Sequence, residues 1–240
     1  MDSEQRAQAK DLQSRIPAAM PDEQITDFEK AKVYRDRMKA LDRLTQQAGS
    51  RYEYSRLSSY EVGDDRFAES RSRVRDRLRE WLDAFDHGEE NGNLLFLGPV
   101  GTGKDHLAYS ACRALLLKVG STVEWVNGRD LVGSFRDRID DASRRTESQL
   151  IAEFARPQVL TISDPLPVVG ELSNYQADIL YRIIDARSRN VRSTIVTVNV
   201  VDDAEGDKRL GVATWDRLQE NAISFHCKWP SYRKKREVIK

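Results

Sequence analysis

A seven-residue loop between an apolar run and a helical pattern constrains this chain more than any other feature. Residues Gly98–Lys104 read GPVGTGK, which has the form G-x-x-x-x-G-K. The loop follows Leu94–Leu97, a run typical of a buried strand, and precedes a helical pattern that begins near residue 103. Glycines let backbone N–H groups surround an anion, and a helix N-terminus adds positive potential. Strand, loop and helix in this order therefore predict a phosphate-binding loop.

The lysine that closes the loop indicates which phosphate compound is bound. A lysine at this place reaches the β- and γ-phosphates of a nucleoside triphosphate. Lys104 therefore predicts a nucleoside triphosphate as the cofactor, accompanied by Mg²⁺. The predicted nucleotide-binding residues are Gly98, Pro99, Val100, Gly101, Thr102, Gly103, Lys104, Asp105 and His106.

The residue after the lysine departs from the motif. The motif has Ser or Thr there, whose hydroxyl binds Mg²⁺, whereas this chain has Asp105. A carboxylate so near the phosphates would repel them unless a cation lies between. The position therefore needs a second observation to explain it.

The apolar run Val159–Ile162 and the residues after it supply that observation. A Walker B strand has four mainly apolar residues, then a metal-associated Asp, then an acid that positions the attacking water. In this register Ser163 takes the metal side and Asp164 the catalytic position. Carboxylate and hydroxyl then look exchanged between Asp105 and Ser163, on two strands expected to be adjacent in the sheet. Mg²⁺ accepts either oxygen, and Asp105, Ser163 and Asp164 are the predicted metal ligands.

A one-residue shift gives a rival interpretation. Asp164 would then be the metal-side acid, and Pro165 would stand where the catalytic acid belongs. Such a protein would bind ATP with crippled hydrolysis. We favour the exchanged register because it accounts for both unusual residues at once.

The fold class follows from how apolar runs alternate with helical patterns. Strands that alternate with helices of this length predict an α/β fold with a mostly parallel sheet. The predicted strands are NLLFL, TVEWV, VLTI, STIVTV and AISFHC, and the predicted helices are 103–119, segments within 129–155, and 174–190.

The N-terminal third has a different texture. Residues 1–48 form a charged helical extension with a narrow apolar stripe, which could dock on the core, pair as a coiled coil or serve a partner. Residues 49–90 are predicted to be a linker and an amphipathic helix of about 67–85, and residues 91–240 the ATP-binding core. The stripe of the extension consists of Ala31, Tyr34, Met38 and Leu41, and the charged face of the second helix carries Arg71, Arg73, Arg75, Arg77 and Arg79.

Composition excludes several classes of protein. The 39 basic and 39 acidic residues cancel, so any contact with nucleic acid must come from local patches. Cys112 and Cys227 have no ligand-like spacing, which disfavours zinc and predicts two reduced, buried thiols. A polar N-terminus and the lack of a long apolar run predict no signal peptide, no membrane span and a cytoplasmic location.

Four segments together resemble one family. They read GPVGTGK, VLTISDPLP, LYRIIDARSRNVRSTIVTVN and WDRLQENAISFHCKWPSYR. The stretch from about 50 to 235 resembles the DnaC/IstB-like branch of the AAA+ ATPases, which comprises replicative helicase loaders and ATP-binding regulators of insertion-sequence transposition. An R-x-x-D-x-R helix (Arg182 to Arg187), a T-x-N strand end and a terminal S-Y-R are more specific than the loop alone.

The resemblance implies a P-loop NTPase core with a five-stranded parallel sheet, ATP at a subunit interface, and a homo-oligomeric ring or open spiral. It also implies that Asn199 is sensor 1, Arg217 an arginine finger that acts on a neighbouring subunit, and Arg233 the sensor 2 arginine. With Asp164, these complete the predicted catalytic residues.

The function expected from this resemblance is an ATP-dependent assembly factor in DNA replication or transposition, similar to a helicase loader. The expected reaction converts ATP and water to ADP and phosphate; its partners would be a replicative helicase or a transposase, and single-stranded or duplex DNA. The alternative is a nucleotide-gated protein-binding module without hydrolysis. A small-molecule kinase is disfavoured, because no lid-like arginine cluster is evident. Candidate DNA contacts are Arg136, Arg138, Arg144 and Arg145.

Overall fold

The core of the protein is a five-stranded parallel sheet. A computed structural model describes residues 27–86, 92–131, 133, 135 and 146–234. In these residues the strand order is β2-β3-β4-β1-β5, and every pairing is parallel. The predicted α/β fold is confirmed. The strands are β1 (Asn93–Leu97), β2 (Val123–Asn127), β3 (Val159–Ser163), β4 (Ser193–Val198) and β5 (Ala222–His226).

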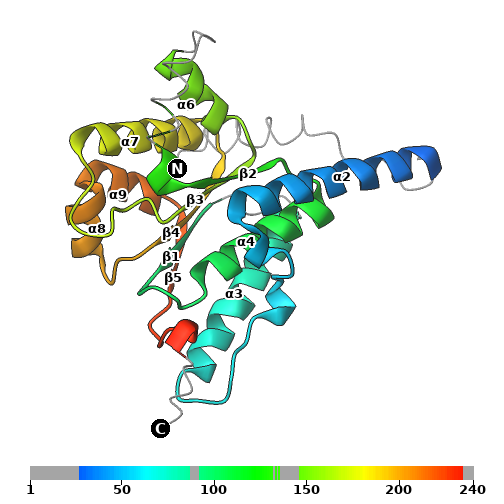
Figure 1. The fold of residues 1–240 in the computed structure, drawn as a ribbon, viewed down its shortest axis with the longest axis horizontal. Coiled ribbons are helices and arrows are strands. Elements are labelled where there is room, and N and C mark those ends of the chain that lie inside the picture. The colour runs from blue at the N-terminus through cyan, green and yellow to red at the C-terminus, as the bar shows by residue number, and fades with distance from the viewer. Residues whose placement is uncertain (1–26, 87–91, 132, 134, 136–145, 235–240) are drawn as a thin grey trace, which may run out of the picture.

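Helices cover both faces of this sheet (Figure 1). One face carries α2 (Asp27–Ala48), α3 (Ala68–Asp86), α4 (Lys104–Ala114) and its π-helical continuation η4 (Leu115–Val119). The other carries α6 (Glu147–Ala155), α7 (Asn174–Arg189), α8 (Asp203–Leu210) and α9 (Val212–Gln219). Short 3-10 turns are η2 (Ser50–Tyr52), η3 (Leu57–Ser59) and η5 (Tyr232–Lys234).

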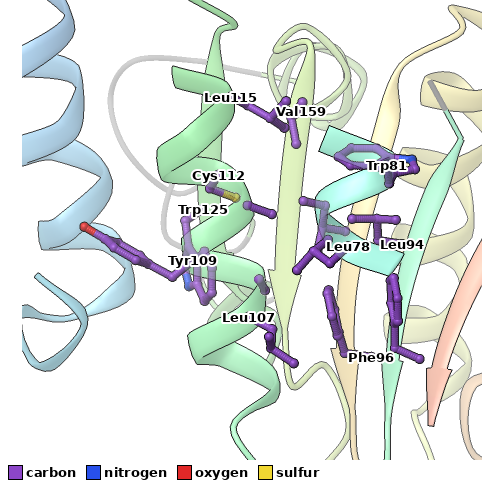
Figure 2. Close-up of a cluster of buried hydrophobic side chains, with 14 of the residues drawn as sticks. Leu78, Trp81, Leu94, Phe96, Leu107, Tyr109, Cys112, Leu115, Trp125 and Val159 are labelled. Carbon is purple, nitrogen blue, oxygen red and sulfur yellow. The ribbon is translucent and has the colours of Figure 1, made fainter. Parts of the chain in front are cut away.

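Strand β1 shows why the sheet is covered on both sides. Its successive side chains point to opposite faces: Leu94 and Phe96 pack with α3 and α4, whereas Leu95 and Leu97 pack with the α6–α9 layer. Figure 2 shows the first of these clusters, in which Trp81 of α3 lies above β1. A strand buried on both faces favours apolar residues at successive positions, which explains the continuous run Leu94–Leu97.

The strand order corrects one expectation. The strands that carry the two predicted motifs, β1 and β3, are not adjacent, because β4 pairs with both. This order places the end of β4 between the loop after β1 and the acidic residues after β3. Residues from β4 therefore enter the site between the two motifs.

Only the C-terminal half of α2 docks on the core. Leu41 and Leu44 are buried, and Arg37 Nη1 donates to the carbonyl of Leu117 at 2.6 Å. Phe28 and Tyr34 are exposed, so the predicted stripe continues into the core only at its C-terminal end. Figure 1 shows the helix extending past the layer formed by α3 and α4.

One arginine of α3 is not on a solvated face. The side chain of Arg71 is 6% exposed and pairs with Asp65 at 2.8 Å. It also donates to the carbonyl of Val62 and lies 5.4 Å from the ring centre of Tyr232. Arg71 thus ties α3 to the preceding segment through hydrogen bonds and to the C-terminal segment through a cation–π contact with Tyr232.

Both cysteines are free and buried, as predicted. Among the described residues, no helix has the length and apolar character that crossing a bilayer requires.

Candidate functional site

The predicted motifs converge on a cavity of about 670 Å³ at the carboxyl ends of the strands. In parallel α/β sheets this edge is where ligands bind. Its walls come from the segment before α3, the loop after β1, the ends of β2, β3 and β4, and the C-terminal segment. The lining residues are Arg51, Tyr52, Ser55, Ser59, Tyr60, Glu61, Val100, Gly101, Gly103, Lys104, Asp105, His106, Asn127, Arg129, Ser163, Asp164, Thr197, Asn199, Tyr232 and Arg233.

The loop after β1 has the tight shape that its glycines predict. Gly98 has a φ of 135°, and a Cβ there would lie 2.5 Å from the carbonyl oxygen of Cys227. Gly101 has a φ of 80°, and a Cβ there would overlap Ser231 Oγ. Both positions therefore require glycine, since an L side chain would be strained and would collide with the neighbouring segment.

Lys104 is the last residue of the loop and the first residue of α4. Its Nζ donates to the carbonyls of Gly98 and Pro99, each at 2.7 Å, and to Asn199 Oδ1 at 2.9 Å. Burial lowers the pKa of Lys104 from its ordinary value, an effect that the nearby carboxylates of Asp105 and Asp164 oppose. The buried ammonium is held by two loop carbonyls, and its positive charge attracts an anion that enters the cavity.

Asp105 is surrounded by hydroxyl groups. Ser163 Oγ donates to Asp105 Oδ1 at 3.0 Å, and Thr197 Oγ1 donates to the same oxygen at 2.6 Å. Tyr52 Oη donates to the other oxygen, Oδ2, at 3.1 Å. The two residues predicted to have exchanged roles are thus in direct contact, although β1, which precedes the loop, and β3, which ends at Ser163, are not neighbours. Thr197 of the intervening β4 completes the group.

Asp164 faces a different set of partners. Its φ of 49° is unusual for a residue other than glycine, and such strain is often found where a side chain must be aimed at a site. Asn199 Nδ2 donates to Asp164 Oδ1 at 2.7 Å, and Arg129 forms an ion pair with Oδ2. Asn199 therefore connects Asp164 to Lys104, since its Oδ1 accepts from the lysine.

The oxygen-rich surroundings of Asp105 fit a magnesium ion. Mg²⁺ is commonly held by one or two protein oxygens together with substrate phosphates and water. Among the described residues no group of three or more His, Cys, Asp or Glu side chains could hold a metal on its own. A site built on one carboxylate and neighbouring hydroxyls agrees with the first pattern, and with Mg²⁺ bound together with phosphate.

The C-terminal segment closes another side of the cavity. The backbone N–H of Tyr232 donates to the carbonyl of Gly101 at 2.9 Å, and Trp229 Nε1 donates to the carbonyl of Thr102 at 2.8 Å. These bonds hold the segment against the loop and bring Arg233 to the cavity. His106 and Tyr60 lie beside it, with ring centres 5.7 Å apart.

Arg217 is the predicted catalytic residue that does not reach this cavity. It lies on α9, where its guanidinium pairs with Asp185 at 3.2 Å and Glu220 at 2.7 Å. Within its own chain these ion pairs lie away from the cavity.

Three of the predicted nucleotide-binding residues, Gly98, Pro99 and Thr102, do not line the cavity. They support the loop from behind, where Thr102 Oγ1 donates to the carbonyl of Pro99 at 3.0 Å.

Several residues of the site were not predicted from the sequence. Tyr52 and Arg129 stand in segments without a recognisable motif, so no local signal indicates them. Thr197 is the first residue of the T-x-N strand end. That motif was recognised in the sequence, but no role was assigned to its threonine. The arginines predicted to contact DNA, Arg136, Arg138, Arg144 and Arg145, lie outside the described residues.

Comparison with known proteins connects this geometry to one group. The family described as "IstB-like ATP binding protein" matches residues 26–239. The replicative helicase loader DnaC of Escherichia coli (strain K12) is 32% identical over 161 residues, which cover 65% of this chain and 62% of that protein. The ATP-binding protein assigned to insertion sequence IS5376 of Geobacillus stearothermophilus is 32% identical over 163 residues, 65% of this chain and 61% of that protein.

Solved structures agree on the fold. The crystal structure of the DnaC helicase loader matches with a TM-score of 0.64 and 24% identity, covering 74% of this chain and 99% of that chain. A crystal structure of DnaI matches with a TM-score of 0.55 and 18% identity, covering 76% and 93% respectively. The matched stretch spans less than two thirds of the length of these curated relatives.

Proposed function

This chain belongs to the family of IstB-like ATP-binding proteins, and we propose that it is an ATP-dependent assembly factor acting on DNA in replication or transposition. The observation that carries the proposal is the convergence of Lys104, Asp105, Ser163, Asp164 and Asn199 on one cavity. Two strand ends, those of β3 and β4, and the N-terminus of α4 contribute these side chains. Such an arrangement suits phosphoryl transfer, where catalysis is mainly positioning and electrostatic stabilisation.

Each residue has a distinct role in this proposal. Lys104 binds the β- and γ-phosphates, and Asp164 orients the attacking water with Asn199 beside it. Arg233, whose side chain lies beside Gly101 of the loop, neutralises phosphate charge. Asp105 and Ser163 would hold Mg²⁺, which would neutralise phosphate charge when bound. The contact between Ser163 and Asp105, and the contact between Asp164 and Asn199, support the exchanged register over its rival.

The exchange makes a prediction about paired substitutions. Asp105→Thr alone removes the carboxylate that takes the place of the usual hydroxyl, so nucleotide binding should become less dependent on Mg²⁺. The double change Asp105→Thr with Ser163→Asp restores the usual order of the two groups and should keep nucleotide binding. A titration with a fluorescent ATP analogue at several Mg²⁺ concentrations measures both. If Asp105→Thr and Ser163→Asp each bind ATP·Mg²⁺ like the parent, the two groups are not exchanged.

A second candidate function is a nucleotide-gated module without hydrolysis. The observation that favours it is the ion pair between Arg129 and Asp164, which engages the proposed catalytic carboxylate. Steady-state phosphate release separates the two functions. Turnover that Asp164→Asn abolishes supports the assembly ATPase, whereas tight ATP binding with no turnover in the parent supports the module.

We further propose that the site is completed by a second copy of the chain. Arg217 lies outside the cavity of its own chain, and an arginine supplied by a neighbour can neutralise transition-state charge. Lys104 and Asp164 would then come from one subunit and Arg217 from the next. The assembly would be a ring or an open spiral.

A shared site predicts that turnover per chain rises with protein concentration. Arg217→Ala should lose turnover, and mixing it with Lys104→Ala protein should restore some, because a mixed interface can join one intact half-site from each. Arg189→Ala is the matched control, since Arg189 also pairs with Asp185 on the surface and should lose little. Turnover independent of concentration, together with a monomer in sedimentation with ATP, would exclude the shared site.

DNA and a helicase or transposase complete the proposal as partners. The helicase loader and the insertion-sequence protein among the relatives support this class of partner. Binding to single-stranded DNA that falls steeply with salt would indicate phosphate contacts.

A further inference from the structure

Tyr52 contacts the oxygen of Asp105 that the sheet does not engage. Ser163 and Thr197 both donate to Oδ1, whereas Tyr52 Oη donates to Oδ2, at 3.1 Å. Burial, and next the neighbouring Asp105 carboxylate, raise the pKa of Tyr52 to about 12. A tyrosine phenol is protonated at neutral pH, so Tyr52 is the donor in this bond. Together the hydroxyls fix both ends of the carboxylate.

The ring of Tyr52 is held in place by aromatic neighbours. It stacks on Tyr109 of α4, with ring centres 5.9 Å apart and an angle of 25° between the planes. The ring of Trp125 on β2 lies 6.3 Å away, and the guanidinium of Arg51 lies 4.6 Å from the centre of the Tyr52 ring. A half-buried tyrosine held in this way presents its hydroxyl to Asp105 at little cost in side-chain entropy.

Both aromatic neighbours are in turn bound by α2. Thr45 Oγ1 and Tyr109 Oη lie 2.6 Å apart, and Figure 2 shows Tyr109 reaching from α4 toward α2. The backbone N–H of Trp125 donates to Gln47 Oε1 at 3.1 Å. A continuous set of contacts therefore runs from α2, through Tyr109 and Trp125, to Tyr52 and Asp105.

We propose that Tyr52 is a positioning residue for Asp105, through which helix α2 completes the metal side of the nucleotide site. The inference rests on the proposed function, because it assigns Asp105 to Mg²⁺. A carboxylate anchored only through Oδ1 could turn about that oxygen, and the Tyr52 hydroxyl sets its plane. Partners that orient a metal ligand typically affect metal affinity by about 10–100-fold when removed. Coupling between two sites acts equally in both directions. If docking of α2 favours Mg²⁺ binding, then Mg²⁺ binding stabilises the docked position of α2.

The substitution Tyr52→Phe tests the role of the hydroxyl alone, since it keeps the ring. Affinity for a fluorescent ATP analogue is titrated against Mg²⁺ in the full chain. We expect the Mg²⁺ concentration for half-saturation to rise by about tenfold, while affinity for the analogue without Mg²⁺ changes by less than about twofold. Tyr54→Phe is the matched control, because Tyr54 is 73% exposed in the same segment, and it should behave like the parent.

Hydrogen exchange of residues 41–52 provides a readout that does not depend on turnover. Adding Mg²⁺ with nucleotide should slow exchange there in the parent and in Tyr54→Phe, and much less in Tyr52→Phe. If the parent binds ATP·Mg²⁺ and the affinity of Tyr52→Phe for the analogue depends on Mg²⁺ as in the parent, Tyr52 does not position Asp105. The proposed function would stand in that case. Equal protection of residues 41–52 in Tyr52→Phe and the parent overturns the link to α2. A parent that binds no nucleotide overturns the proposed function, and this inference with it.

Discussion

Replacing Lys104 by alanine should lower the affinity for ATP by about tenfold or more. The lysine is the buried cation of the loop, and a charge-assisted contact of this kind contributes about 1.5–3 kcal/mol. Lys104 lines the cavity, so an anion that enters it can contact the ammonium group. Calorimetric or fluorescence titration with ATP measures the loss.

The control for this change is Lys208→Ala. Lys208 lies on α8, is exposed, and does not line the cavity, so its loss should leave ATP affinity unchanged. Because Lys104 also binds Asn199 Oδ1, a thermal unfolding curve must show that the Lys104→Ala variant remains folded. If that variant is folded and binds ATP like the parent, the assignment of this loop to phosphate is refuted.

The second large effect is expected at Arg187, which is fully buried. Its Nε donates to Thr194 Oγ1, and its two Nη atoms donate to backbone carbonyls. Those carbonyls belong to Phe154, Pro157, Gln158 and Ser193. Burial lowers the pKa of Arg187 to about 9, so the group is still charged at neutral pH. One guanidinium thus joins α7 to the end of α6, the segment before β3 and the start of β4.

Arg187→Met should destabilise the protein by about 3–5 kcal/mol, because it leaves buried carbonyls without donors. Replacing a buried charge by an apolar side chain can be neutral when its partners are replaced as well, but here the partners are backbone and remain. The expected fall in melting temperature is about 10 °C for a chain of this size. Urea unfolding followed by circular dichroism gives the free energy directly.

Arg189→Met on the same helix is the control for this measurement. Its side chain is 72% exposed and pairs with Asp185, so the change should cost about 0–1 kcal/mol. A loss below about 1 kcal/mol in Arg187→Met would mean that burying the charge costs as much as its hydrogen bonds return.

Position along the apolar stripe distinguishes the buried arginines from the exposed ones. Arg187 follows Leu180 and Ile184 at helical spacing, and Arg71 precedes Val74 and Leu78 in the same way. Both arginines therefore lie on the side of their helix that faces the core. Assigning all five arginines of 71–79 to one charged face was wrong for Arg71, which is buried, because charge was given more weight than spacing.

The sequence by itself determined the α/β class, the phosphate-binding loop and the position of an acidic residue, Asp164, directly after the strand at 159–163. These follow from local patterns, because strand and helix periods and glycine-rich turns act over a few neighbouring residues. The positions of the strands within the sequence were accurate to about one residue for the same reason.

Only the tertiary structure decided which side chains meet around Asp105. The order β3-β4-β1 places Thr197 between the two motifs, and the docking of α2 brings Tyr52 to the second carboxylate oxygen. Tyr52 is 53 positions from Asp105 in the sequence, and Thr197 is 92 positions from it. Contacts over such separations depend on how the strands are ordered in the sheet and how the helices pack on it. No local period of the chain encodes that order, because it is set by the burial of whole faces rather than by neighbours in sequence.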